Sequence, residues 1–186
     1  MIELSNIEFY TTPEGEVMVK PVGQPAYVLK ENCRDVICEM LAAIRERYPK
    51  AHDALMKLYS ASSMNRIAYE YKVVHRFIRC NFGEYNQATI DINHNGAFQL
   101  EEVGCPLRGE CPLEGKICKP ELNTNLTDRE MAVFRLYAKN LQTDQIADEL
   151  YISPCTVNRH RENIKAKLKL NSVAEMVAYW YENSMK

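Results

Sequence analysis

The sequence predicts an α+β N-terminal domain followed by an all-α domain of four helices. Residues 1–104 combine two hairpin signals with three amphipathic helical patterns. From residue 124 onward, four short helical patterns follow one another, each with its own start signal. Proline, glycine and three cysteines crowd the segment between these two parts. We therefore expect a division into residues 1–104, a cysteine-rich junction at 105–123, and residues 124–186.

Two hairpins and three helices are expected in the N-terminal part. Residues 7–10 and 16–20 flank Thr-Thr-Pro-Glu-Gly, which is typical of a hairpin turn. Residues 88–92 and 97–100 flank Asn-His-Asn-Gly, a second hairpin signal that turns through Asn95-Gly96. The apolar face of a long first helix comprises Leu29, Cys33, Val36, Ile37, Met40, Leu41 and Ile44. Pro49 begins a shorter helix, and the third is marked by Ile67, Tyr71, Val74 and Ile78.

Start and stop signals divide the C-terminal part into helices. Thr127 and Glu130 fit a capping box, and Asn140 suits a left-handed helix end. Ser153-Pro154 is a strong helix start. The inward stripe of the third helix consists of Val157, His160, Ile164 and Leu168. The fourth helix begins with a second capping box, formed by Ser172 and Glu175, and its apolar stripe consists of Val173, Met176, Val177 and Trp180.

Positive charge is concentrated on the third of these helices. Residues 153–170 contain the basic residues Arg159, Arg161, Lys165, Lys167 and Lys169, and Glu162 as the one acid. Nine basic and eight acidic residues make the whole segment from Thr124 onward nearly neutral. A basic row on a single helix suits an element that lies in the major groove of DNA. The alternative is a solvated basic face on an ordinary helical bundle.

Residues 126–182 resemble the LuxR/GerE-type helix-turn-helix domain of bacterial transcription factors. The resemblance is carried by Leu126-Thr127-x-Arg129-Glu130, Ile146-Ala147-x-x-Leu150, Ile152-Ser153, Thr156-Val157, His160, Asn163-Ile164 and Lys167-Leu168. It implies a four-helix domain that reads a DNA half-site and often dimerises through the fourth helix. The chain departs from the family's usual residues at five positions. It has Asn140 in place of glycine, Gln142 in place of serine, Asp144 in place of a basic residue, Asn158 in place of lysine and Val173 in place of arginine.

The resemblance assigns base reading to Asn158, Arg159 and Glu162. Arginine can donate to both acceptors of guanine, asparagine can donate to N7 of adenine and accept from its N6 amino group, and glutamate can accept from the amino group of cytosine. The full set of expected DNA contacts is Thr143, Ser153, Thr156, Asn158, Arg159, His160, Arg161, Glu162, Lys165 and Lys167. Each can instead be a side chain that merely faces solvent, and His160 can be a packed histidine on the inward stripe.

Six residues, Cys-Pro-Leu-x-Gly-x, are nearly repeated at positions 105 and 111, and a third cysteine follows at 118. The expected metal ligands are Cys80, Cys105, Cys111 and Cys118, which suit zinc or an iron–sulfur cluster. The spacing of the last three resembles the loop of IscR/NsrR-type iron–sulfur regulators. The same residues can instead be free thiols or one disulfide with no cofactor, and Cys80 can be a core residue. The substitute ligands are His75, His94, Cys33 and Cys38.

Composition limits the remaining classes. At 46% hydrophobic and 26% charged residues, the chain has the composition of an ordinary globular protein, and no apolar run approaches a membrane span. The acidic N-terminus does not resemble a signal peptide, so we expect a cytoplasmic protein without membrane contact. Residues 1–123 have 14 basic and 17 acidic residues, which argues against a second DNA-binding surface there.

The sequence therefore favours a DNA-binding transcriptional regulator, a homodimer and not an enzyme. One alternative is a sigma-factor-like partner of RNA polymerase, because sigma factors share the Ile-Ala…Thr-Val pattern. Another is a thiol redox enzyme with a DNA anchor, although the chain contains no Cys-x-x-Cys.

Overall fold

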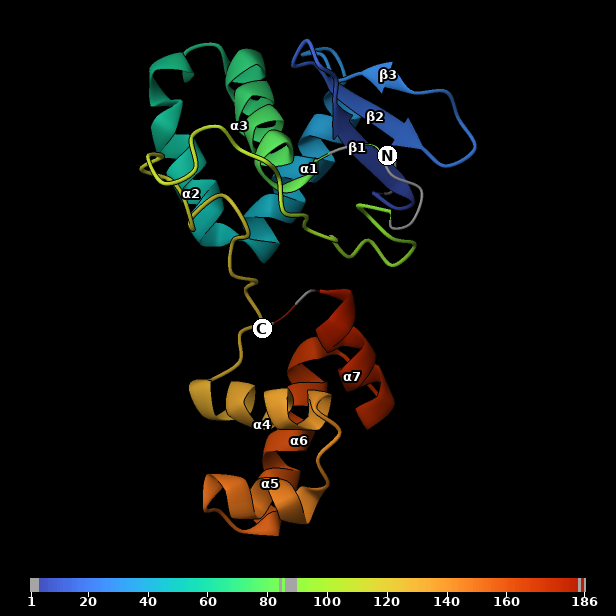
Figure 1. Cartoon of the computed structure of the whole chain (residues 1–186), viewed down its shortest axis with the longest axis vertical. Coiled ribbons are helices and arrows are strands. Elements are labelled where there is room, and N and C mark those ends of the chain that lie inside the picture. Colours follow the sequence, from blue (N-terminus) through green and yellow to red (C-terminus); the bar gives the residue numbers. More distant parts are fainter. Residues whose placement is uncertain (1–3, 84, 86–89, 184, 186) are drawn as a thin grey trace. The chain divides into compact units, whose positions relative to one another are not determined.

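The structure is a computed structural model that describes residues 4–83, 85, 90–183 and 185 (Figure 1). The chain divides into two compact units, Met1–Asn123 and Thr124–Lys186. The cysteine-rich segment clusters with the first unit. None of the helices in the described ranges is both long and apolar enough to cross a membrane.

The N-terminal unit begins with a three-stranded antiparallel sheet in the order β1 (Ile7–Thr11), β2 (Val17–Pro21) and β3 (Tyr27–Val28). The first predicted hairpin is confirmed, with Phe9 opposite Val19. Both side chains are fully buried, as alternation along the strands requires for one inward face. β3 was not predicted, because two residues are too few to show an alternating pattern.

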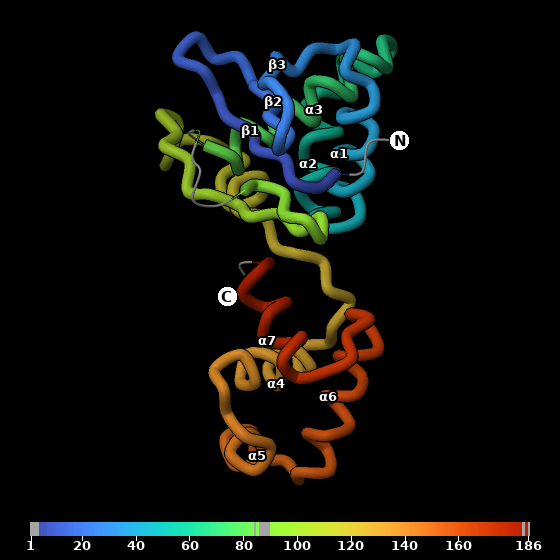
Figure 2. The backbone as a smooth tube through the Cα atoms, turned by 90° about the vertical axis from the view of Figure 1, so that its right-hand side faces the viewer, coloured from blue at the N-terminus to red at the C-terminus, as the bar shows by residue number. Residues whose placement is uncertain are grey.

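Three helices complete this unit: α1 (Arg34–Arg47), α2 (Pro49–Leu58) and α3 (Arg66–Asn81), with a 3₁₀ turn η1 (Ser60–Ser62) between the last two. The three predicted helices are therefore present, but the start of the first was placed too early. Leu29 is buried outside the helix, because its N–H still donates to the carbonyl of Val17 in β2 at 2.8 Å. α3 lies against β1 and β2, and α1 and α2 pack on α3 (Figure 2).

The second predicted hairpin is a short one. Ile92 and Phe98 form an antiparallel bridge, and Gly96 takes a positive φ of 72° at the turn. A further bridge joins Ile92 to Ile7, so the hairpin extends the edge of the sheet. Residues 88 and 89 of the predicted first strand lie outside the described residues.

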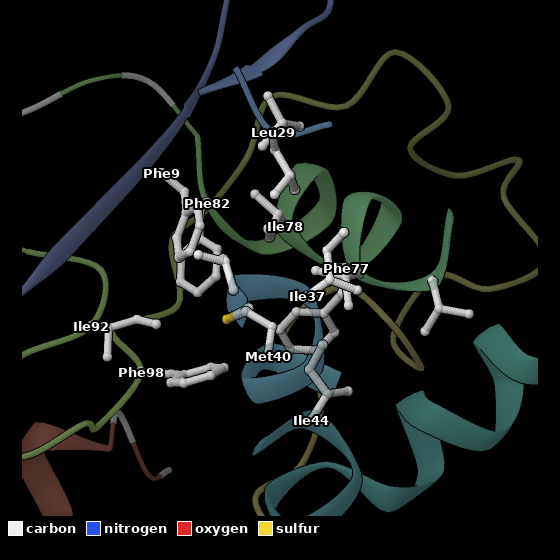
Figure 3. Close-up of a cluster of buried hydrophobic side chains, with 14 of the residues drawn as sticks. Phe9, Leu29, Ile37, Met40, Ile44, Phe77, Ile78, Phe82, Ile92 and Phe98 are labelled. Carbon is white, nitrogen blue, oxygen red and sulfur yellow. The ribbon is translucent and has the colours of Figure 1, made fainter. Parts of the chain in front are cut away.

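One apolar core joins these elements (Figure 3). Phe9 and Phe82 stack with their ring centroids 5.5 Å apart, and Phe77 and Phe98 meet edge to face at 6.4 Å. The core takes one or more side chains from the sheet, each of the three helices and the 92–98 hairpin. Since each large apolar side chain contributes about 1.5–3 kcal/mol on burial, this core orders the unit.

The C-terminal unit contains α4 (Asp128–Ala138), α5 (Thr143–Leu150), α6 (Pro154–Leu168) and α7 (Val173–Glu182). The predicted four-helix domain is confirmed. Trp180 of α7 meets Phe134 of α4 edge to face at 5.0 Å, and Met176 is fully buried. The predicted capping box on α7 forms by half: Ser172 accepts from the Glu175 N–H, but the Glu175 carboxylate accepts from the N–H of Asn171.

Candidate functional site

A helix–turn–helix is formed by α5 and α6, which pack on each other, while α6 also crosses α4 (Figure 1). Although the family's serine is absent, the side chain of Gln145 accepts from the Gln142 N–H at 2.8 Å and closes the start of α5. Tyr151 ends α5 in the left-handed conformation at a φ of 53°. The Ser153 hydroxyl then accepts from the Thr156 N–H and starts α6. These local signals fix the direction in which α6 leaves the turn.

α6 has one buried face and one exposed face. Val157 and Ile164 are fully buried against α4 and α5. The three residues expected to read bases, Asn158, Arg159 and Glu162, are all exposed. The helix therefore presents an amide, a guanidinium and a carboxylate together on its outer surface.

Ion pairs on α6 distinguish its charged residues. Glu162 lies 3.1 Å from Arg161 and 2.8 Å from Lys165, and these hydrogen bonds lower the pKa of its carboxyl group. Within the described ranges, Arg159 makes no ion pair. Its charge is therefore free for an external partner, whereas Arg161 and Lys165 share an acid that a ligand must compete with.

Lys167 has an internal partner that its sequence context does not show. Its ammonium lies 2.6 Å from Glu130 at the start of α4, and only 3% of Glu130 is exposed. Burial disfavours the charged carboxylate, but hydrogen bonds from Lys167 and from Thr127 outweigh it and lower the pKa of Glu130 to about 2. Lys167 thus joins the end of α6 to the predicted capping box, which the structure contains.

The other expected contacts lie around the start of α6 and α5. The Ser153 and Thr156 hydroxyls are 2.9 Å apart, and the Thr143 hydroxyl is 3.1 Å from that of Tyr137. His160 is half-buried, and its Nδ1 is buried without a hydrogen-bond partner in the part of the chain that the structure describes. It lies between the inward stripe and the exposed face.

Tyr151 is a further candidate for DNA contact that was not predicted from the sequence. It is 95% exposed and occupies the turn between the two helices. Its position in the turn could have been predicted. α5 must end between Leu150 and Ser153, and a helix that ends so abruptly commonly has a residue in the left-handed conformation directly after it.

The four cysteines expected to bind metal gather in the N-terminal unit. A small cavity of about 10 Å³ is lined by Cys105, Cys111 and Cys118, and Cys80, at the end of α3, is in hydrogen-bonding contact with Cys118. Burial, together with Cys118 and Cys105 and against the opposing charge of Arg76, raises the pKa of the Cys80 thiol to about 11. As they stand, no three Cys, His, Asp or Glu side chains of the described residues converge closely enough to hold a metal ion.

The substitute ligands lie elsewhere. Cys33 precedes α1, Cys38 is an exposed residue on α1, and His75 packs beside Tyr71 on α3 at 5.2 Å. His94 is exposed in the 92–98 hairpin. None of these four lines the cavity between the cysteines.

Comparison with known proteins places the C-terminal unit in a family. The family model described as "Bacterial regulatory proteins, luxR family" matches residues 124–180. The chain is 39% identical over 56 residues to the Fimbriae Z protein of Escherichia coli K12, a match that covers 30% of this chain and 27% of that protein. It is 45% identical over 60 residues, 32% of this chain and 29% of the relative, to the nitrate/nitrite response regulator protein homolog of Haemophilus influenzae.

A third relative is the response regulator protein VraR of Staphylococcus aureus Mu3, which is 33% identical over 67 residues, 36% of this chain and 32% of that protein. The chain thus spans about a third or less of the length of the curated relatives it matches. Residues 124–180 are therefore a regulatory domain of the bacterial luxR family, as their motifs predict.

Proposed function

We propose that the chain is a DNA-binding transcriptional regulator whose α6 reads base edges in the major groove. The observation that carries this proposal is the exposed row Asn158, Arg159 and Glu162 on a helix whose opposite face is buried. An α-helix fits the major groove, where each base pair presents a distinct set of donors and acceptors. Arg159 supplies two parallel donors for guanine, Asn158 a donor and an acceptor for adenine, and Glu162 an acceptor for cytosine.

Phosphate contacts are assigned to the start of α6 and to its basic side chains. Ser153 and Thr156 lie at the helix N-terminus, where the helix dipole favours an anion and their hydroxyl groups can donate to it. Arg161 and Lys165 can exchange their exposed partner Glu162 for phosphate at little cost, because exposed ion pairs contribute little. Exchange is less favourable for Lys167, since it would leave Glu130 buried without its cation. We therefore assign Lys167 mainly to the fold.

We infer that two copies of the chain associate through α7. The helix buries Met176 and Trp180 against α4, yet Ala174, Ala178 and Tyr181 at positions i, i+4 and i+7 are exposed on a second face. Small residues allow two helices to approach closely. A dimer with two-fold symmetry would present two α6 helices to two half-sites of a palindromic operator.

Selection from random double-stranded DNA tests the proposed function. The full chain should enrich a short sequence, arranged as an inverted repeat if the dimer is correct. As a matched control, Lys57→Ala removes one exposed positive charge from α2 in the N-terminal unit and should enrich the same sequence. Failure of the full chain to enrich any sequence would contradict the proposal. Enrichment only in the presence of core RNA polymerase would instead favour the sigma-like alternative.

A further inference from the structure

We propose that Cys80, Cys105, Cys111 and Cys118 form a four-thiolate site for a thiophilic metal, either one zinc ion or an iron–sulfur cluster. The site lies wholly within the N-terminal unit, so the proposal does not depend on DNA binding by α6. Four cysteine thiolates are a ligand set shared by structural zinc sites and iron–sulfur clusters.

Two copies of one turn position Cys105 and Cys111. The carbonyl of Cys105 accepts from the Arg108 N–H at 3.2 Å, and that of Cys111 accepts from the Glu114 N–H at 3.0 Å. Each turn is followed by a glycine at positive φ, 86° at position 109 and 73° at position 115. The sequence repeat is therefore a structural repeat, and both cysteines line the same cavity.

Asn81 fixes the third cysteine of the segment beside α3. The buried Asn81 amide donates to the carbonyl of Ile117 at 2.9 Å, and its oxygen accepts from the Lys119 N–H at 2.8 Å. These two bonds hold the backbone on either side of Cys118 at the end of α3, next to Cys80. In Figure 1 this segment, drawn in yellow, runs beside α3, to which Asn81 holds it.

The segment has little else to hold it. Of residues 105–118, only Ile117 is buried, and Leu107 is 48% exposed. A chain made of turns with one buried apolar side chain gains little from the hydrophobic effect. Metal–sulfur bonds are the kind of cross-link that orders such segments in small domains.

Arg76 gives a second and independent indication. Arg76 is half-buried, and its Nε atom is buried without a hydrogen-bond partner within the described ranges, which is costly for an N–H group. Arg76 lies one turn before Cys80 on α3, and these two residues line a pocket together with Cys105. A centre of four thiolates has a net negative charge, and a guanidinium donating to its sulfurs would stabilise it.

Metal binding requires the sulfurs to move closer together than they are in this structure. Zinc with Zn–S bonds of about 2.3 Å holds its sulfurs about 3.8 Å apart, and no three side chains of the described residues are now placed to bind one ion. The sulfurs of a cluster are farther apart, because they bind different iron atoms. The present cavity has room for about one atom, and the turns that surround it contain no helix or strand to resist adjustment.

Metal analysis of the full chain, purified without oxygen, tests the proposal. We expect either one zinc per chain and no visible absorption, or iron with sulfide and broad visible absorption. Cys111→Ser and Cys118→Ser should reduce the metal content to below a tenth of wild type, whereas Cys38→Ser and Cys155→Ser, which change exposed cysteines elsewhere, should retain it. Wild type that contains no metal and takes up none on titration with Zn²⁺ would overturn the proposal, as would equal loss in all four variants.

Thiol alkylation of the native wild type keeps the proposal testable if the serine variants do not fold. Mass spectrometry should find Cys38 and Cys155 modified rapidly, and the four proposed ligands modified only after a chelator, or oxygen for a cluster, has removed the metal. Equal rates at Cys111 and Cys38 before that treatment would contradict the site. A Cys80–Cys118 disulfide in protein purified without oxygen would also contradict it.

Discussion

Glu130 shows how one buried carboxylate links three parts of the C-terminal unit. It closes the capping box with Thr127 and accepts the ammonium of Lys167 from the end of α6. Because its pKa is lowered to about 2, this carboxylate stabilises the fold at pH values above about 4.5, and the contribution is lost as the pH falls towards 2. The orientation of α6 against α4 therefore depends on a charge pair as well as on apolar packing.

Replacing Lys167 should destabilise this unit. Lys167→Met leaves a buried carboxylate without its cation, so we expect the free energy of unfolding at pH 7 to fall by about 1–3 kcal/mol. The difference from wild type should shrink as the pH approaches 2. Denaturant unfolding of the full chain at several pH values measures this. The control is Lys165→Met, whose partner Glu162 is exposed; equal losses in the two variants would show that the Glu130 pair contributes nothing special.

Asp91 predicts a pH dependence of opposite sign in the N-terminal unit. Its carboxyl group is 1% exposed and accepts from the Phe9 N–H at 2.6 Å. Burial, aided by the nearby acids Glu8 and Glu101 and opposed by that hydrogen bond, raises its pKa to about 8. A raised carboxyl pKa stabilises the fold fully below about pH 4, and this contribution is lost as the pH rises through 8.

In Asp91→Asn, a neutral amide oxygen can keep the bond to Phe9. The free energy of unfolding of wild type should fall by up to about 1.4 kcal/mol per pH unit between pH 5 and pH 8, and the variant should show a flatter profile. Thermal unfolding across this range measures both. Parallel profiles would mean that Asp91 is charged in the folded protein.

For single residues, the sequence predicts helix caps better than it predicts ion pairs and hydrogen bonds between residues far apart in the chain. Thr127 with Glu130, and Ser153 before Pro154, are local patterns, and both form. The pairing of Lys167 with Glu130 spans 37 residues and follows only from how α6 crosses α4. The clamp of Asn81 on the cysteine segment spans 36 residues and was invisible for the same reason.

Among the elements, α7 carries the prediction about assembly. Its tyrosines have partners within the unit: Tyr179 lies 6.4 Å from the Phe134 ring, and the Tyr181 hydroxyl donates to the Ala138 carbonyl at 3.0 Å. A charge at Tyr179 would therefore disturb the core as well as an interface. Ala178, which is exposed, is the cleaner position.

Ala178→Glu should separate the proposed dimers without unfolding the helix. Burying a carboxylate at a two-fold interface places two like charges close together, so we expect the dissociation constant of the dimer to rise at least tenfold. Sedimentation velocity measures this, with circular dichroism to verify helicity. Ala61→Glu, at an exposed alanine of η1, is the matched control and should leave assembly unchanged. Monomeric wild type, free and on DNA, would rule out the interface.

Element boundaries were predictable where turn chemistry is local. Pro49 starts α2 and the Pro13-Glu14-Gly15 turn joins β1 to β2, as expected. The first helix begins at Arg34 and not at Leu29, because Leu29 satisfies a helical period while its backbone belongs to the sheet. Periodicity reports which side chains are buried, but it does not report which backbone partner a residue chooses.

For the whole molecule, the sequence predicts the structure of the C-terminal unit better than that of the N-terminal unit. The C-terminal unit follows from motifs that specify caps, turn and stripe together, and the family match covers the same residues. In the N-terminal unit the helices and hairpins follow from periodicity, but the contacts that tie the cysteine segment to α3 depend on packing that no local pattern encodes. The fold of this unit nevertheless places Cys105, Cys111 and Cys118 around one cavity and Cys80 beside Cys118, although their spacing in the sequence identified them only as candidate ligands.

The central claim is that the exposed face of α6 selects DNA sequence. The most direct measurement is the affinity of the full chain for its selected sequence and for a scrambled duplex, at several salt concentrations, in wild type, Arg159→Ala and Lys165→Ala. Arg159→Ala should cost about 1–3 kcal/mol on the selected sequence, relax preference at one base pair, and affect the scrambled duplex far less. Lys165→Ala should weaken both duplexes alike and lower the salt slope by about one. Equal weakening of both duplexes by Arg159→Ala would contradict the account.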